Sequence, residues 1–275
     1  MLFRNKKCTQ CGSSYDVVEE TCPTCHARDE SFETLNIPKN MVWLPIYKQV
    51  LLFLLGFVVL NLISSLSIEL IFKHFFEENS VTMILIVNYL RYTLTLGMMG
   101  VLLIHSYPKF KDSFIKWLPY VVGVIAGLIL IGFNISYNVI VGIFHEFGTN
   151  ENQTMANALV KTYPVLAFFL LSFLGPVVEE LTYRVGLFTF LTRVHKALAY
   201  SIVIILFGLI HFNFDATGSA LIDELLSLPV YLVSGATLCI LYDKLGLSCS
   251  LVAHIVNNIT STLPIIFTLL IGQGQ

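Results

Sequence analysis

The sequence predicts an all-α polytopic membrane protein, a helical bundle of about seven transmembrane helices preceded by a small cysteine-rich segment. Of its 275 residues, 56% are hydrophobic and 12% are charged, whereas an ordinary soluble domain has about 25% charged residues. Long apolar runs recur after residue 45 without strand-like alternation, and in lipid such runs satisfy their backbone polar groups as helices. The net charge of -2 offers no basic surface, so we expect no nucleic-acid partner.

The cysteine-rich segment is the first element of the chain. Four of the six cysteines form two Cys-x-x-Cys pairs ten residues apart, Cys8, Cys11, Cys22 and Cys25. This spacing is typical of a small zinc ribbon, in which four thiolates surround a structural Zn²⁺ ion; a pair of disulfides is the alternative. We expect the ribbon to occupy residues 1–30, to depend on the metal for folding and to offer a docking surface for a protein partner.

A polar linker is expected over residues 31–45, followed by a membrane-embedded domain over residues 46–275. The fifth and sixth of the seven expected spans are the shortest, against a need for roughly 20 apolar residues per span. The spans lie near residues 46–72, 83–105, 118–144, 163–193, 197–213, 225–243 and 247–271.

Loop charges orient the chain in its membrane. Basic residues follow the second and fourth spans, and acidic residues dominate the alternate loops. The excess of Lys and Arg in cytoplasmic loops therefore predicts a multi-pass protein of the cell membrane with a cytoplasmic N-terminus. Zinc-binding thiolates need a reducing compartment, which leads to the same orientation.

Charged residues inside the fourth span indicate a functional site. Glu179, Glu180 and Arg184 lie in an otherwise apolar run, where each buried charge costs roughly 2.5 to 3.5 kcal/mol at mid-membrane. Glu180 and Arg184 are four residues apart on one helix face, so we expect them to form an ion pair. Glu179 points about 100° away and is expected to face the bundle interior, either protonated or engaged with a histidine.

Two later spans supply further polar groups. Glu179 and His211 lie at similar distances from the turn near Lys196, so an antiparallel helix pair brings them to similar depth. In the last span His254 and Asn258 are four residues apart and share a face, whereas Asn257 is expected to point elsewhere. A carboxylate and an imidazole can activate water, and a second imidazole and a carboxamide can stabilise an oxyanion.

Three motifs carry a resemblance to a known family. They are EExxxR from Glu179 to Arg184, FxxxH from Phe207 to His211 and HxxxN from His254 to Asn258. Over roughly residues 160–265 the chain resembles the CAAX protease and bacteriocin-processing (CPBP, or Abi) intramembrane proteases. The resemblance implies an endopeptidase in which Glu179 and His211 activate water and His254 and Asn258 form the oxyanion hole. Glu180 and Arg184 would then support them.

The substrate and any catalytic metal are less defined by the sequence. We expect a small membrane-associated peptide or protein substrate, without a recognisable prenyl-binding signature. A carboxylate and two histidines are also ligand types of catalytic zinc, but the resemblance favours a metal-free mechanism. A catalytically inactive scaffold or immunity protein is the alternative function. A proton-coupled transporter is the third, although no internal repeat is evident between the halves.

One buried cation has no assigned role. Arg91 lies well inside the second span. It either pairs with Glu69, lines the access cavity of the site, or shows that the second span starts later along the chain. Polar groups such as these can also hold helices together through interhelical hydrogen bonds, which is the structural alternative for each motif.

Overall fold

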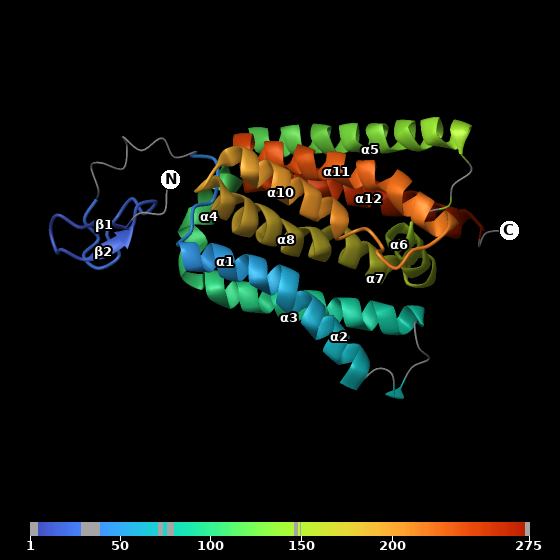
Figure 1. Ribbon diagram of the computed structural model, residues 1–275, viewed down its shortest axis with the longest axis horizontal. Coiled ribbons are helices and arrows are strands. Elements are labelled where there is room, and N and C mark those ends of the chain that lie inside the picture. Colours follow the sequence, from blue (N-terminus) through green and yellow to red (C-terminus); the bar gives the residue numbers. More distant parts are fainter. Residues whose placement is uncertain are drawn as a thin grey trace.

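The fold was analysed in a computed structural model that describes residues 5–28, 39–70, 74–75, 80–145, 148 and 150–272, with the side chains of 68–70 and 270–272 excluded. Most of the expected linker, residues 31–38, lies outside this description. A small lobe with two strands sits at one end of a long helical bundle (Figure 1). The expected all-α membrane fold with a cysteine-rich N-terminal segment is therefore confirmed.

Six helical runs among the described residues are long and apolar enough to cross a membrane. The chain is therefore a multi-pass membrane protein. The runs are Ile46–Ser67, Val81–Ile115, Leu118–Phe144, Pro164–Thr192, Ser219–Leu245 and Leu247–Leu269. Their helices are α1 (Ile46–Leu54), α2 (Leu60–Leu70), α3 (Val81–Leu103), α4 (Tyr107–Ile115), α5 (Leu118–Phe144), α7 (Pro164–Phe169), α8 (Gly175–Glu179), α9 (Thr189–Thr192), α11 (Ser219–Leu245) and α12 (Leu247–Gly272).

Two helices in the described part of the chain fall outside these six runs. The span expected at 197–213 is the apolar helix α10 (Lys196–Leu209), whose 14 residues rise about 21 Å, short of the roughly 30 Å hydrocarbon core. It nevertheless packs against α11 as part of the bundle. Helix α6 (Glu151–Thr162) is more polar, and the Asn150 side chain caps its N-terminus by accepting a hydrogen bond from Gln153 N at 3.0 Å.

The small lobe is a two-stranded ribbon. Strands β1 (Asn5–Lys7) and β2 (Ser14–Asp16) pair antiparallel, with Lys6 opposite Tyr15. The turn between them holds the first cysteine pair and uses Gly12 at φ +74°, a conformation that favours glycine.

The ribbon is docked on the helical bundle. Val18 belongs to the same buried apolar cluster as Trp43 and Leu44. Residues 41–44, which the sequence places in the linker, are buried in that cluster, so the helical domain takes in the chain from Met41 onward. This differs from the expected linker over 31–45 because Met-Val-Trp-Leu is an apolar run that the end of the bundle can cover.

Close helix packing surrounds the last span. A Cβ atom added at Gly127 on α5 would lie 2.7 Å from Val256 Cβ and 2.9 Å from the Ala253 carbonyl oxygen on α12. Glycine therefore lets the two backbones approach, as is common between membrane helices. At Gly132, further along α5, no atom lies within 4 Å of the corresponding position.

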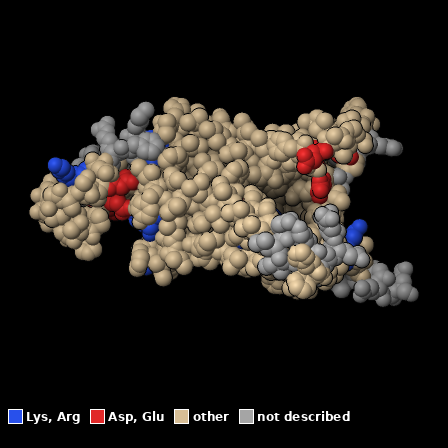
Figure 2. All heavy atoms as spheres, turned by 60° about the horizontal axis from the view of Figure 1, so that its bottom comes forward, with Lys and Arg blue, Asp and Glu red and all other residues tan. Residues whose placement is uncertain are grey.

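The surface charge pattern agrees with a membrane-spanning bundle. Figure 2 shows Lys, Arg, Asp and Glu atoms at the two ends of the long axis, with uncharged residues between them on that face. Many large apolar side chains along α5 are exposed, including Ile129 and Ile143. Such a band of apolar surface suits contact with lipid.

Candidate active site

The residues of the three motifs converge on one cavity of about 900 Å³ inside the bundle. Glu179 ends α8, His211 follows α10, and His254 and Asn258 lie on α12; all four line the cavity. Helices α3, α5, α6 and α11 supply its other walls. The structure therefore brings together the four residues that the sequence proposes for catalysis.

The helix that carries the two glutamates is irregular on both sides of them. Wider π-helical turns run over Leu170–Leu174 and Glu180–Phe188, separated by the short α8. Such π-helical segments are rare and occur frequently at functional sites. Thr189 Oγ1 donates to the Arg184 carbonyl oxygen at 2.9 Å. This hydrogen bond satisfies a backbone acceptor of the wide turn.

Glu180 anchors this region and takes no part in lining the cavity. Its side chain is fully buried, and its Oε1 lies 3.2 Å from Arg184 Nη1 and 3.0 Å from His254 Nδ1. The predicted ion pair between Glu180 and Arg184 is confirmed. The additional contact shows that Glu180 also orients His254, so a carboxylate on one helix holds an imidazole on another.

Glu179 faces the cavity, as the helix geometry predicted. Its Oε2 is buried, makes no hydrogen bond to a described residue and lies 3.7 Å from His254 Nε2. The histidine that approaches Glu179 most directly is thus His254, whereas His211 lines the same cavity and makes no hydrogen bond to Glu179. A carboxylate oxygen that borders a polar cavity and makes no hydrogen bond to a described residue is well suited to bind and polarise water.

The orientation of His211 defines which ring nitrogen can act. Its Nδ1 lies 2.8 Å from the Phe207 carbonyl oxygen. A carbonyl oxygen only accepts, so Nδ1 carries the proton of the neutral ring and Nε2 keeps the lone pair. His211 can therefore accept a proton through Nε2. Its ring stacks on Tyr231, with centroids 4.4 Å apart and planes 12° apart.

Asn258 is held by neighbours on two sides. Its Nδ2 donates to the Leu171 carbonyl oxygen at 2.9 Å, and its Oδ1 accepts from Asn257 Nδ2 at 3.3 Å. One Nδ2 hydrogen thus remains for a ligand. The expectation that Asn257 points elsewhere is wrong, because Asn257 also lines the cavity and its Oδ1 accepts from Asn134 Nδ2 at 3.5 Å. The cavity is wide enough for adjacent helix positions to border it.

Phe207 connects the three motifs, a role that the sequence did not reveal. Its ring lies under the Arg184 guanidinium at 4.5 Å and beside the rings of His211 and His254 at 5.1 and 5.8 Å. Cation–π and edge-to-face contacts of this kind keep neighbouring side chains in one arrangement. The only available signal was its place at the start of FxxxH.

Tyr231 is a second residue that the sequence did not single out. Besides stacking on His211, its hydroxyl accepts from Asn150 Nδ2 at 3.3 Å and from Asn152 Nδ2 at 3.2 Å. Asn150 Nδ2 also lies 3.5 Å from the His211 carbonyl oxygen. The start of α6 is therefore linked to His211 through one tyrosine, a relation that depends on tertiary structure alone.

Arg91 lines the same cavity, which is one of the three alternatives raised by the sequence. It lies in the middle of α3, and its guanidinium carbon is 5.0 Å from the centre of the Tyr92 ring. The alternative partner, Glu69, has a side chain outside the described part of the chain.

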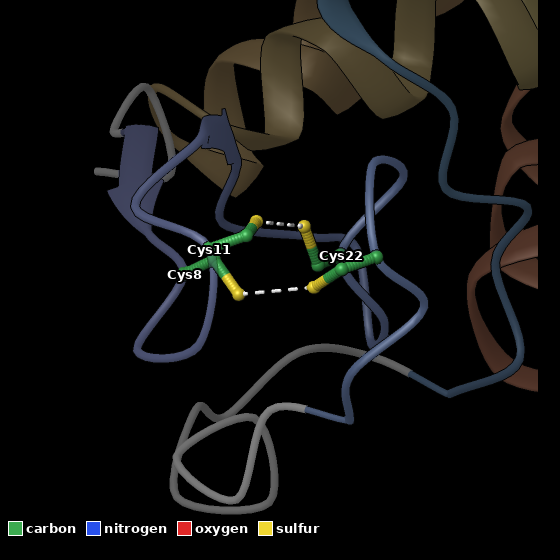
Figure 3. A group of neighbouring side chains, drawn as sticks. Cys8, Cys11 and Cys22 are labelled. Atoms are coloured by element: carbon green, nitrogen blue, oxygen red, sulfur yellow. Dashed lines mark hydrogen bonds between the residues drawn. The ribbon is translucent and has the colours of Figure 1, made fainter.

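The ribbon cysteines form a separate cluster far from the cavity. All four Sγ atoms lie within 4.8 Å of one another, and the distances Cys8–Cys25 and Cys11–Cys22 are 3.5 and 3.6 Å. Figure 3 shows thiols of the two knuckles directed toward one another. Zn–S bonds of about 2.3 Å place tetrahedral sulfur atoms about 3.8 Å apart, so these residues can hold a metal ion of that size.

The environment of two of the four cysteines, Cys11 and Cys22, favours thiolate. A hydrogen bond between the Ser13 hydroxyl and the Cys22 sulfur, 3.1 Å long, lowers the pKa of Cys22 to about 5. The same hydroxyl lies 3.0 Å from Cys11 Sγ and lowers the pKa of that thiol as well. All four are free cysteines, as metal binding requires.

Comparison with known proteins finds a family model that the motif region resembles. Residues 161–260 match the family model described as type II CAAX prenyl endopeptidase Rce1-like. The chain carries an Rce1-like segment. This segment contains Glu179, His211, His254 and Asn258, and it confirms the resemblance to the CPBP proteases that the three motifs indicated.

A curated relative extends the comparison. The UPF0177 protein YvdC of Lactococcus lactis subsp. lactis (strain IL1403) is 32% identical over 89 residues, which are 30% of this chain and 34% of YvdC. The match thus spans about a third of that relative. No solved structure matches the chain. The ribbon and helices α1 to α5 lie outside the Rce1-like segment.

Proposed function

We propose that this protein is an intramembrane endopeptidase that hydrolyses a peptide bond in a small membrane-associated peptide or protein. The observation that supports this most directly is the shared cavity of Glu179, His211, His254 and Asn258. The Rce1-like segment supports the same reaction class. A cavity buried in an apolar bundle also explains why costly polar groups are retained in the spans.

In the proposed mechanism, Glu179 and His211 activate water. The water binds between the free Oε2 of Glu179 and Nε2 of His211, transfers one proton to this pair and attacks the scissile carbonyl carbon. The oxyanion then accepts hydrogen bonds from His254 Nε2 and from the free hydrogen of Asn258 Nδ2. With Nδ1 held by Glu180, His254 donates through both nitrogens when both carry protons. When the intermediate collapses, the C–N bond breaks and the proton held by the Glu179–His211 pair passes to the leaving amine.

The decisive experiment compares the purified protein with single variants on candidate peptides in nanodiscs. We expect Glu179→Gln and His211→Ala to abolish cleavage, and Asn258→Ala to lower kcat about 100- to 1000-fold because one oxyanion donor is lost. Glu20→Gln is the matched control, since Glu20 is an exposed ribbon carboxylate paired with Arg28. Full biological function in Glu179→Gln would instead support the catalytically inactive scaffold or immunity protein.

Metal use is proposed to be confined to the ribbon. The four cysteines would hold one structural Zn²⁺, and the reaction at Glu179 would need no metal. The test is zinc analysis of the full chain and of a Cys11→Ser/Cys22→Ser variant. We expect one zinc per chain in the wild type and none in the variant. Stoichiometric zinc that persists in the variant and disappears with His211→Ala would contradict the proposal.

The proposed location is the cell membrane, with the ribbon in the cytoplasm. Lys109, which pairs with Glu19 at 2.6 Å, and Arg193, which pairs with Asp16 at 3.2 Å, lie at the ribbon end of the bundle. This clustering of basic loop residues supports a cytoplasmic ribbon. Labelling Cys11 with a membrane-impermeant maleimide should succeed only after the membrane is opened. Labelling in intact cells would indicate the opposite orientation, with the ribbon outside the cell.

A further inference from the structure

The substrate cavity contains a cation that no part of the proposed mechanism uses. Arg91 supplies the cavity's guanidinium, and Glu179 its carboxylate; no other Lys, Arg, Asp or Glu belongs to the described lining. Glu179 approaches His254, and Glu180 pairs with Arg184. Among the described residues, therefore, no carboxylate pairs with Arg91.

The position of Arg91 makes this lack of a carboxylate informative. The residue is near the middle of a 23-residue membrane helix, and its Nε is buried without a hydrogen-bond partner among the described residues. A cation at such a depth costs several kcal/mol unless an anion or a set of acceptors stabilises it. Its contact with the ring of Tyr92, which also lines the cavity, contributes part of this stabilisation.

Arg91 also lies close to the reacting groups. A Cβ atom added at Gly175 would be 4.0 Å from Glu179 Oε1 and 4.0 Å from Cζ of Tyr92, so the glutamate and the tyrosine that Arg91 contacts flank one glycine. An extended peptide advances about 3.3 Å per residue, so one short peptide segment can contact both Arg91 and the reacting groups.

The remaining cavity wall suits a peptide backbone. Carboxamides from several helices line it, among them Asn88, Asn134 and Asn157. Asn134 Oδ1 is buried without a hydrogen-bond donor among the described residues, so it can accept from a peptide N–H. Carboxamides offer both a donor and an acceptor, as an extended peptide requires.

We propose that Arg91 is the specificity-determining residue of this cavity and binds a carboxylate of the peptide substrate close to the cleaved bond. This inference rests on the proposed peptidase function and adds the substrate's chemical class. The carboxylate comes either from an Asp or Glu side chain or from a free C-terminus. Both have the planar geometry that a guanidinium binds through two hydrogen bonds.

The test measures binding first, so that it does not depend on turnover. The probes are fluorescein-labelled decapeptides of Ala, Asn and Ser with one central Glu or Gln, each with a free or amidated C-terminus, and the protein is full-length Glu179→Gln in nanodiscs. We expect a carboxylate peptide to bind about 10- to 100-fold more tightly than its neutral partner, the range of one buried charge-assisted pair. The Glu/Gln and acid/amide pairs separate the two carboxylate sources.

Substitution of the arginine provides the second measurement. Adding Arg91→Gln should bring the ratio between the dissociation constants of the neutral and the carboxylate peptide to about one. Arg91→Lys should retain part of the preference for the carboxylate peptide because the charge remains. Lys161→Gln is the matched control, since Lys161 is exposed on α6 and should leave the ratio unchanged. Equal binding of all four peptides, or a ratio that survives Arg91→Gln, would overturn the inference.

Cleavage by the wild-type protein then separates the two proposals. If carboxylate peptides bind through Arg91 but wild type and Glu179→Gln both leave them intact, the peptidase function fails and the binding site stands. If wild type cleaves all four peptides at equal kcat/KM, the peptidase function stands and the carboxylate inference fails.

Discussion

At the scale of single residues, the site depends on how each histidine is held. His254 has both ring nitrogens near glutamates, whereas His211 has one nitrogen on a backbone carbonyl and its ring face on Tyr231. The stack on Tyr231 and the bond from Nδ1 to the Phe207 carbonyl oxygen hold the His211 ring in one orientation, with Nε2 available to the cavity. Tyr231 therefore acts through His211 and is a positioning residue.

This arrangement predicts different effects for two substitutions of Tyr231. Tyr231→Leu removes the aromatic stack and should lower kcat about 2- to 12-fold with little change in KM, from the usual free energy of an aromatic pair. Tyr231→Phe keeps the stack but frees the side chains of Asn150 and Asn152. It should keep kcat near the wild-type value and raise KM, because the start of α6 is then held less firmly beside the substrate cavity.

Steady-state kinetics on one peptide distinguishes these outcomes. The matched control is Phe214→Leu. It removes an exposed aromatic ring from the connection between α10 and α11, which also holds His211, and Phe214 does not line the cavity. Equal kcat values for Tyr231→Leu and Tyr231→Phe would show that the stack does not position His211.

At the scale of helices, the close approach of α5 to α12 places His254 and Asn258. Gly127 faces Val256, which lies between those two residues on α12. Gly127→Ala should therefore force the backbones apart, destabilise the protein by about 1 to 3 kcal/mol and reduce activity. Gly132→Ala, on the same helix with open space at its Cβ position, should be neutral or slightly stabilising.

Thermal unfolding in detergent, together with peptidase activity, checks this pair. Similar unfolding temperatures for the two alanine variants would mean that α12 can shift without cost. An unfolding temperature that falls while activity persists would separate the packing role of Gly127 from the placement of His254 and Asn258.

The element scale also shows what the sequence could and could not predict. Spacing from the turn near Lys196 predicted that Glu179 and His211 share one depth, because helical rise is regular. The same regularity failed for Asn257, since cavity width depends on how helices pack. The π-helical turns around Glu180 were equally inaccessible, because hydrophobic spacing does not distinguish them from α-helix. Tyr231 and Arg91 acquire their roles only from tertiary neighbours.

At the scale of the whole molecule, one buried arginine joins the ribbon to the helix that carries Glu179. Arg193 follows the end of the run Pro164–Thr192. Its Nη1 contacts Asp16 of the ribbon at 3.2 Å, its Nη2 donates to the Leu44 carbonyl oxygen at 2.7 Å, and its guanidinium lies 5.4 Å from the Trp43 ring centre. Deleting the ribbon would thus disturb the membrane domain, which is why metal analysis should use the full chain.

Asp16→Asn should therefore destabilise the folded protein more than the position of Asp16 on a small surface lobe suggests. The variant weakens a charge-assisted contact to a fully buried guanidinium, a loss of about 1 to 3 kcal/mol. In a Trp117→Phe background Trp43 is the single tryptophan, so its emission should shift to longer wavelength when the ribbon detaches. Glu20→Gln, an exposed carboxylate paired within the ribbon, should change neither the unfolding temperature nor the emission.

The same contact predicts how metal removal reaches the active site. Because the cysteines shape the ribbon that presents Asp16, chelation of the full chain should shift Trp43 emission as Asp16→Asn does and should lower peptidase activity. In Asp16→Asn the ribbon is already partly detached, so chelation should have a smaller further effect on both readouts. If chelation instead lowers activity equally in wild type and Asp16→Asn, the metal acts on catalysis by a route other than the Asp16–Arg193 contact.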